Sequence, residues 1–160
     1  AARFGSRVQW SLSHGVDDLD RLEMPLDRYR AYAAAQADET PLYVFDADFG
    51  SKAPELLGDF DASVGGLFRE DYLEVMRQRP PHRWVVAGPG RTGAPWHQDP
   101  AGTSAWNALL EGRKRWALYP PTVVPPGVQV ATRDEEGING EHEVEAVKTP
   151  SSLQWYLEVY

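Results

Sequence analysis

The sequence predicts a mainly β domain, either a β-sandwich or a barrel, with a few flanking helices. Many short apolar or β-favouring runs are separated by turn residues, and the chain contains 14 glycines and 13 prolines. The two stretches that predict helices both lie in the first half of the chain. The 160 residues, of which 42% are apolar, suffice for one domain with its own core, so residues 1–160 are expected to form a single domain.

The first two elements follow from local patterning. Alternating charged and apolar residues predict a short strand at 21–26. A helix is expected over Pro25–Ala37, because proline suits the first helical position and Tyr29 and Ala33 recur at helical spacing.

The next elements extend to the middle of the chain. Residues 42–45 are apolar and β-favouring, which predicts a buried strand. Residues 46–64 are rich in Gly, Pro and Asp and are expected to be mostly loop. Residues 67–77 have apolar positions at helical spacing, which predicts an amphipathic helix. A strand at 84–87 should then lead into a turn-rich loop at 88–93.

The clearest hairpin is predicted between residues 103–110 and 113–119. A two-residue turn at Glu111 and Gly112 would pair Leu109 with Lys114, and paired residues share a face. The inward face would then carry Asn107, Leu109, Lys114 and Trp116. A slip of one residue would reverse one strand's set.

The last part of the chain gives weaker signals. A Pro- and Val-rich connection follows the hairpin, and residues 133–145 are expected to form an acidic loop. Residues 152–160 are expected to form either a short strand or a helix.

Composition restricts the chemistry. The chain has no cysteine, so any metal must be held by His, Asp or Glu. A net charge of −8 argues against direct binding to nucleic acid or anionic membranes. No run approaches the roughly 18 apolar residues of a membrane span. The start lacks an initiator Met and an apolar signal core, which predicts a fragment of a longer protein.

The most informative residues are His97 and Asp99. On a strand, residues two apart point to the same face, so an imidazole and a carboxylate would meet at one point. They would supply two ligands of the two-histidine, one-carboxylate triad that holds non-haem Fe(II). The alternative is a hydrogen bond between the two side chains in a turn before Pro100.

Two further residues of the hairpin support a binding site. An inward Lys114 is costly to bury without an anionic partner, and a carboxylate-bearing cosubstrate would supply one. The alternative is an exposed lysine whose stem covers Trp116. Asn107 on the same face would also need partners, either the cosubstrate or a local structural hydrogen bond.

Several segments together resemble the Jumonji-C family, and the similarity is nearest to the lysyl hydroxylase/arginine demethylase type. It covers roughly residues 20–160 and rests on segments 41–46, 80–84, 97–100, 102–109 and 112–116. The resemblance implies a double-stranded β-helix, also called a cupin-like jelly roll. It also implies Fe(II), 2-oxoglutarate and O2 as reactants.

The resemblance assigns roles to individual residues. His97 and Asp99 correspond to two iron ligands, and Lys114 to the residue that binds the distal carboxylate of 2-oxoglutarate. Asn107 and Tyr43 correspond to neighbours of 2-oxoglutarate in its pocket. In addition, Trp84 matches a strand position near the site.

Three departures from the family pattern matter. No histidine here corresponds to the family's downstream ligand, Ala94 stands where close relatives carry a hydroxyl residue, and the family's N-terminal helical region is missing. We therefore expect a partial domain, truncated at both ends, whose apolar strand edges are covered by a missing segment, a partner chain or an oligomer.

The resemblance implies an oxygenase that hydroxylates lysine or demethylates arginine or lysine on a protein. The alternative is an inactive scaffold or interaction module with the same fold, and a zinc or other metal hydrolase is a third hypothesis. The fragment alone is expected to be inactive. An intracellular, nuclear location is a family-level expectation.

Overall fold

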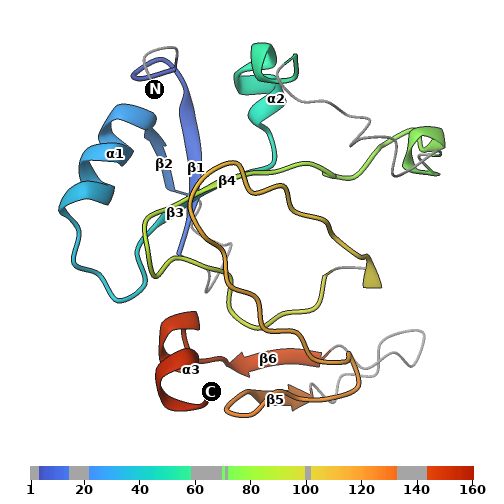
Figure 1. The fold of residues 1–160 in the computed structure, drawn as a ribbon. Coiled ribbons are helices and arrows are strands. Elements are labelled where there is room, and N and C mark those ends of the chain that lie inside the picture. Colours follow the sequence, from blue (N-terminus) through green and yellow to red (C-terminus); the bar gives the residue numbers. More distant parts are fainter. Residues whose placement is uncertain (1–3, 15–21, 59–69, 71, 100–101, 133–143) are drawn as a thin grey trace. The chain divides into compact units, whose positions relative to one another are not determined.

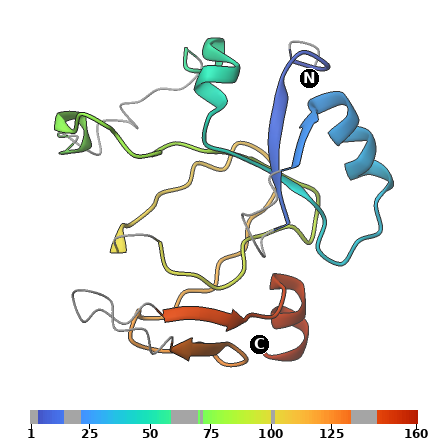
Figure 2. The same cartoon turned by 180° about the vertical axis from the view of Figure 1, so that it is seen from behind.

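The computed structural model describes residues 4–14, 22–58, 70, 72–99, 102–132 and 144–160. They belong to two compact units, residues 1–93 and 94–160. The first unit holds a four-stranded antiparallel sheet with short helices, and the second a two-stranded ladder and one helix (Figures 1 and 2). A mainly β chain with few helices is consistent with a cupin-like fold.

The sheet of the first unit has the strand order β2-β1-β3-β4 (Figure 1). Its strands are β1 (Gln9–Ser13), β2 (Leu22–Pro25), β3 (Tyr43–Asp46) and β4 (Val85–Ala87). The predictions of β2, β3 and β4 are confirmed, whereas β1 was not predicted. Within β1, Trp10 and Leu12 are buried and alternate with more exposed residues, as expected of a strand with one face on the core.

Helix α1 (Leu26–Ala35) confirms the first predicted helix and packs beside β2. The core joins it to the sheet through Phe4, Val8, Trp10, Leu12, Tyr29, Val44, Phe49 and Ala53. The Tyr29 hydroxyl lies 3.1 Å from the carbonyl oxygens of Leu42 and Ala87, to which it can donate. Burial, with the nearby Tyr32, raises the pKa of Tyr29 to about 12.

The predicted loop at 46–64 was partly wrong. It contains helix α2 (Phe49–Lys52) and the 3-10 turn η1 (Pro54–Leu56), and residues 59–64 lie outside the described part. Phe49 and Ala53 are buried in the core. Their packing holds the chain in a helical turn despite Gly50, because tertiary contacts override weak local propensity.

The predicted helix at 67–77 was also wrong for its described residues. Only a 3-10 turn, η3 (Tyr72–Val75), forms there, and residues 67–69 and 71 lie outside the described part. Tyr72 and Val75 are 79% and 88% exposed, so the expected apolar side has no core to pack on. Without such packing a short helix is marginal in water.

The predicted hairpin is the largest error. Residues 103–119 contain no strand, although the chain bends at 111–112 and Gly112 adopts a φ of 87°. Nearly all side chains of 103–119 are exposed, including Leu110 at 96%. A two-stranded hairpin with no face buried on a core has little to stabilise it.

The second unit has regular structure only in its later part. Strands β5 (Gln129–Thr132) and β6 (Val144–Lys148) pair antiparallel and were not predicted (Figure 2). Of the strand and the helix expected as alternatives at 152–160, the helix is present, as α3 (Ser152–Glu158). It starts with a capping box, in which the Ser151 hydroxyl accepts from the Gln154 amide and the Gln154 side chain accepts from the Ser151 amide.

None of the helices within the described residues is long and apolar enough to cross a membrane.

Candidate metal and cosubstrate site

His97 and Asp99 lie together at the start of the second unit. The Nε2 atom of His97 is 3.4 Å from the Oδ1 atom of Asp99. The side chains are 55% and 38% exposed, so both can be reached from solvent. The two side chains meet as expected, but residues 94–99 form no strand, so the contact also fits the alternative of a direct His97–Asp99 interaction before Pro100.

A backbone hydrogen bond indicates which nitrogen of the His97 ring carries the proton in the neutral form. Its Nδ1 atom lies 2.8 Å from the carbonyl oxygen of Pro95, which can only accept, so Nδ1 carries a proton. In the neutral ring, Nε2 then holds the lone pair that faces Asp99. Metal-binding histidines are commonly fixed in this way, with the second ring nitrogen donating to a backbone carbonyl.

His82 makes a useful contrast with His97. Its Nδ1 atom also faces a proline carbonyl, that of Pro80, at 3.3 Å. Its Nε2 atom, however, accepts a hydrogen bond of 2.9 Å from Nε of Arg83. The lone pair of His82 is therefore used within the protein, whereas that of His97 faces a carboxylate.

The His97–Asp99 pair suits a small divalent cation. Two lone-pair donors facing each other repel unless a proton or a cation lies between them, and imidazole with carboxylate is a donor set that non-haem Fe(II) accepts. Ligands about 2.1 Å from one ion and at right angles are about 3 Å apart, close to the 3.4 Å found here. Among the described residues, no three His, Asp or Glu side chains gather at one point.

Lys114 adopts the arrangement that the sequence left as the alternative. The residue is exposed, and its ammonium nitrogen lies 4.4 Å from the centre of the Trp116 ring. Desolvation lowers the pKa of Lys114. No ion pair of Lys114 occurs within the described part of the chain, so its charge is open to an anion from solution.

Asn107 is exposed. The prediction of a buried Asn107 on an inward face was therefore wrong, because the hairpin that would have created that face is not paired. A role for Asn107 in binding a cosubstrate stays a prediction.

Tyr43 and Trp84, the other two predicted residues, lie in the first unit and share Phe45 as a neighbour. The Trp84 ring stacks on Phe45 with centroids 6.3 Å apart, and Tyr43 meets Phe45 edge-on at 6.0 Å. Tyr43 is buried, whereas Trp84 is 46% exposed. Tyr43, Phe45 and Trp84 thus form one aromatic row on β3 and the residue directly before β4.

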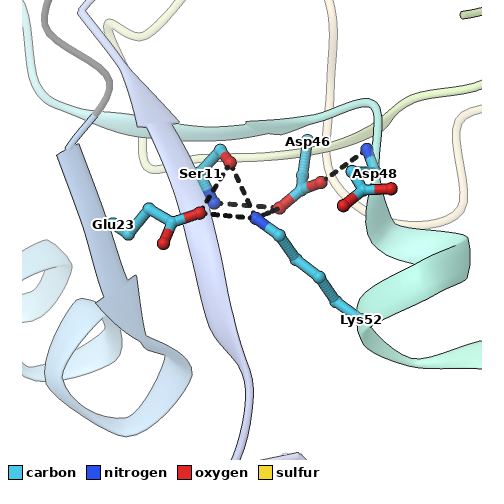
Figure 3. A network of polar contacts seen from close by, with 5 residues as sticks. All are labelled: Ser11, Glu23, Asp46, Asp48 and Lys52. Atoms are coloured by element: carbon cyan, nitrogen blue, oxygen red, sulfur yellow. Dashed lines mark hydrogen bonds and ion pairs between the residues drawn. The ribbon is translucent and has the colours of Figure 1, made fainter.

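Sequence reasoning missed a polar network in the first unit, which Figure 3 shows in detail. The fully buried carboxylate of Asp46 accepts from the Ser11 amide at 2.9 Å and from the Asp48 amide at 2.8 Å. Lys52 donates to Asp46 at 2.9 Å, to Glu23 at 2.8 Å and to the Ser11 hydroxyl at 2.9 Å. Three elements are joined by one ammonium group.

The network fixes the charges of its members. Burial alone would raise the pKa of Asp46, but the hydrogen bonds from Ser11, Lys52 and Asp48 outweigh it and hold the pKa below its usual value. Burial alone would lower the pKa of Lys52, but its bonds to Glu23 and Asp46 raise it. Since Lys52 pairs with both Asp46 and Glu23 within the unit, the network is structural.

No protein-family model matches the chain, but several known proteins are similar to it. It is 53% identical over 143 residues to the lysine-specific demethylase JMJ21 of Arabidopsis thaliana, which covers 88% of this chain and 14% of that protein. It is 38% identical over 151 residues to psr-1 of Caenorhabditis elegans, named a bifunctional arginine demethylase and lysyl-hydroxylase, over 89% of this chain and 38% of the relative.

A shorter match involves human JMJD4, named a 2-oxoglutarate and iron-dependent oxygenase. It is 38% identical over 56 residues, or 35% of this chain and 12% of JMJD4. The chain thus spans well under half the length of each of these relatives.

Proposed function

The chain belongs to the Jumonji-C family, in the subgroup of arginine demethylases and lysyl hydroxylases, and from that premise we propose that it carries part of an iron centre in a 2-oxoglutarate-dependent oxygenase. The observation that carries the proposal is the facing pair of His97 Nε2 and Asp99 Oδ1, 3.4 Å apart. We also propose that the complete protein forms the double-stranded β-helix of the family.

Each predicted residue has a part in the proposed site. His97 and Asp99 would hold Fe(II), and the Pro95 carbonyl would keep the His97 lone pair directed at the metal. Lys114, whose ammonium has no ion pair in the described residues, would bind the distal carboxylate of 2-oxoglutarate. The resemblance to the family is the ground on which Asn107, Tyr43 and Trp84 are proposed as further cosubstrate-binding residues. When bound, Fe(II) and 2-oxoglutarate supply the oxidising chemistry with O2.

The triad needs a second histidine. We propose that it comes from outside the part of the chain that the structure describes. This requirement makes the longest natural form of the protein the correct material for every test of activity.

The proposed substrate is a lysine or arginine side chain on a protein. The names of JMJ21 and psr-1 support this class, because they cover lysine demethylation, arginine demethylation and lysyl hydroxylation. All three reactions begin with oxidation of a C–H bond on a long cationic side chain. One metal centre can therefore serve each of them.

Metal titration tests the proposal. Mn(II), a redox-inert substitute for Fe(II), would be titrated into the longest natural form with and without 2-oxoglutarate. We expect binding that 2-oxoglutarate tightens and that His97→Ala abolishes. His82→Ala is the matched control, since its lone pair is already used by Arg83, and should bind as wild type. No binding by the wild type would favour the scaffold alternative.

A further inference from the structure

We propose that helix α3 positions the metal-binding pair by clamping the segment that carries His97, with Ser152, Trp155 and Gln98 as positioning residues. The role in metal binding rests on the proposed function, whereas the contacts between α3 and residues 94–98 are present whether or not a metal binds. All the residues involved lie in the second unit.

The His97–Asp99 pair needs such support because burial does not supply it. The two side chains are 55% and 38% exposed, so close packing does not by itself hold them in place. The segment is also irregular, without strand neighbours to set its backbone. A metal site held to within about 0.5 Å requires restraint from another source.

The first restraint is on the backbone before His97. The Ser152 hydroxyl, in the first turn of α3, donates to the Ala94 carbonyl at 3.0 Å. This bond joins residues 58 positions apart and ties the backbone just before His97 to helix α3.

The second restraint is aromatic and lies directly before His97. The Trp96 ring meets Trp155 edge-on with centroids 5.1 Å apart and meets Tyr119 edge-on at 5.4 Å. Trp155 is itself 97% buried and donates from Nε1 to the Pro126 carbonyl at 2.8 Å. Trp96 is thereby held between the helix and the 119–126 loop.

The third restraint follows His97. The Gln98 side chain donates from Nε2 to the Pro121 carbonyl at 3.0 Å, in the loop that also carries the Trp155 acceptor. His97 is thus bracketed by Ala94 and Trp96 on one side and by Gln98 on the other. The ring then needs only the Pro95 carbonyl to fix its remaining rotation.

The test uses small substitutions that leave Trp155 and the core intact. In the longest natural form, Ser152→Ala and Gln98→Met should each weaken Mn(II) binding by about 10-fold, the low end of the range for groups bonded directly to a metal ligand, because both act through the backbone. Ser152→Thr keeps the hydroxyl and should restore binding. Ser51→Ala and Gln78→Met, at exposed positions of the first unit, are the matched controls and should change nothing.

A second readout separates this inference from the proposed function. Hydrogen–deuterium exchange of peptides covering 94–99, in the metal-free protein, should be faster in Ser152→Ala and Gln98→Met than in Ser152→Thr or the controls. Unchanged exchange would overturn the clamp even if wild type binds Mn(II). Faster exchange with no Mn(II) binding by wild type would uphold the clamp while the proposed function fails.

Discussion

In residues 1–93, the buried Asp46 carboxylate receives three donors from the protein itself, from Ser11, Asp48 and Lys52. In residues 94–160, the lone pairs of His97 and Asp99 face each other on exposed side chains, and Lys114 carries a charge without an ion pair among the described residues. The first arrangement is complete without a ligand. The second is one that a cation and a carboxylate would complete.

The contrast teaches where stability and chemistry are located. A buried charge must be satisfied inside the fold, or the fold loses several kcal/mol. An exposed donor pair costs the fold little and can instead be held in place by neighbours. The first unit therefore shows the properties of a structural core, and the second those of a binding site.

The sharpest way to break the first unit is to remove its buried carboxylate. Asp46→Ala would leave the partly buried Lys52 with only Glu23 as a counter-charge. The backbone amides of Ser11 and Asp48 would also lose their hydrogen-bond acceptor. We expect the free energy of unfolding to fall by about 3–5 kcal/mol, measured by urea denaturation. Asp48→Ala, whose exposed side chain caps nothing, should cost well under half as much.

Acid should weaken the first unit through the same residue. Because the pKa of Asp46 is lower in the folded than in the unfolded chain, the unfolded state takes up the proton first as the pH falls. The stability that Asp46 contributes to the fold is fully present above its ordinary pKa of 3.8 and is lost as the pH falls through its pKa in the folded chain. The urea concentration at the unfolding midpoint should decrease more steeply between neutral pH and about pH 3 in wild type than in Asp46→Asn. Parallel curves for the two proteins would contradict this.

Removing a charge from the second unit should weaken the binding of 2-oxoglutarate rather than lower the free energy of unfolding. Lys114→Met removes the proposed partner of the distal carboxylate, and a hydrogen bond to a charged group contributes about 1.5–3 kcal/mol. We expect 2-oxoglutarate to bind 10- to 100-fold more weakly in calorimetry with Mn(II) present, with unchanged affinity for Mn(II) alone. Arg113→Met, at the exposed neighbouring position, serves as the control and should leave both affinities unchanged.

A smaller effect is expected at Gly88, which directly follows β4 and lies close to Tyr43. A Cβ atom at Gly88 would lie 2.5 Å from Thr92 Oγ1 and 2.8 Å from Tyr43 Cβ. Gly88→Ala should therefore destabilise the first unit by about 1–3 kcal/mol, as overpacking does. Gly90→Ala, where a Cβ meets nothing within 4 Å, should shift the thermal midpoint far less.

Sequence patterning predicted the elements whose side chains pack on a core. The elements β2, α1, β3 and β4 all pack on the core of the first unit, and this packing is why their apolar spacing predicted them correctly. The alternation of Trp10 and Leu12 in β1 was a similar signal that could have been used. The capping box at Ser151 and Gln154 would have favoured the helix at 152–158.

Long-range partners could not be read from the sequence. The hairpin at 103–119 needs a buried face to pair, and local alternation does not reveal whether such a face exists. The bonds from Lys52 to Glu23 and from Ser152 to Ala94 join residues 29 and 58 positions apart. The meeting of His97 and Asp99, by contrast, is local: the prediction of contact held, although the strand geometry from which it was derived is absent.

The most direct test of the proposed iron centre is the rate of 2-oxoglutarate-dependent succinate formation by the longest natural form with Fe(II) and O2. Wild type and Asp48→Ala should form succinate at similar rates, and Asp99→Ala should form it at least about 100-fold more slowly, because one metal ligand is lost. Equal rates in wild type and Asp99→Ala, or no succinate from the wild type, would contradict an oxygenase centre built on His97 and Asp99.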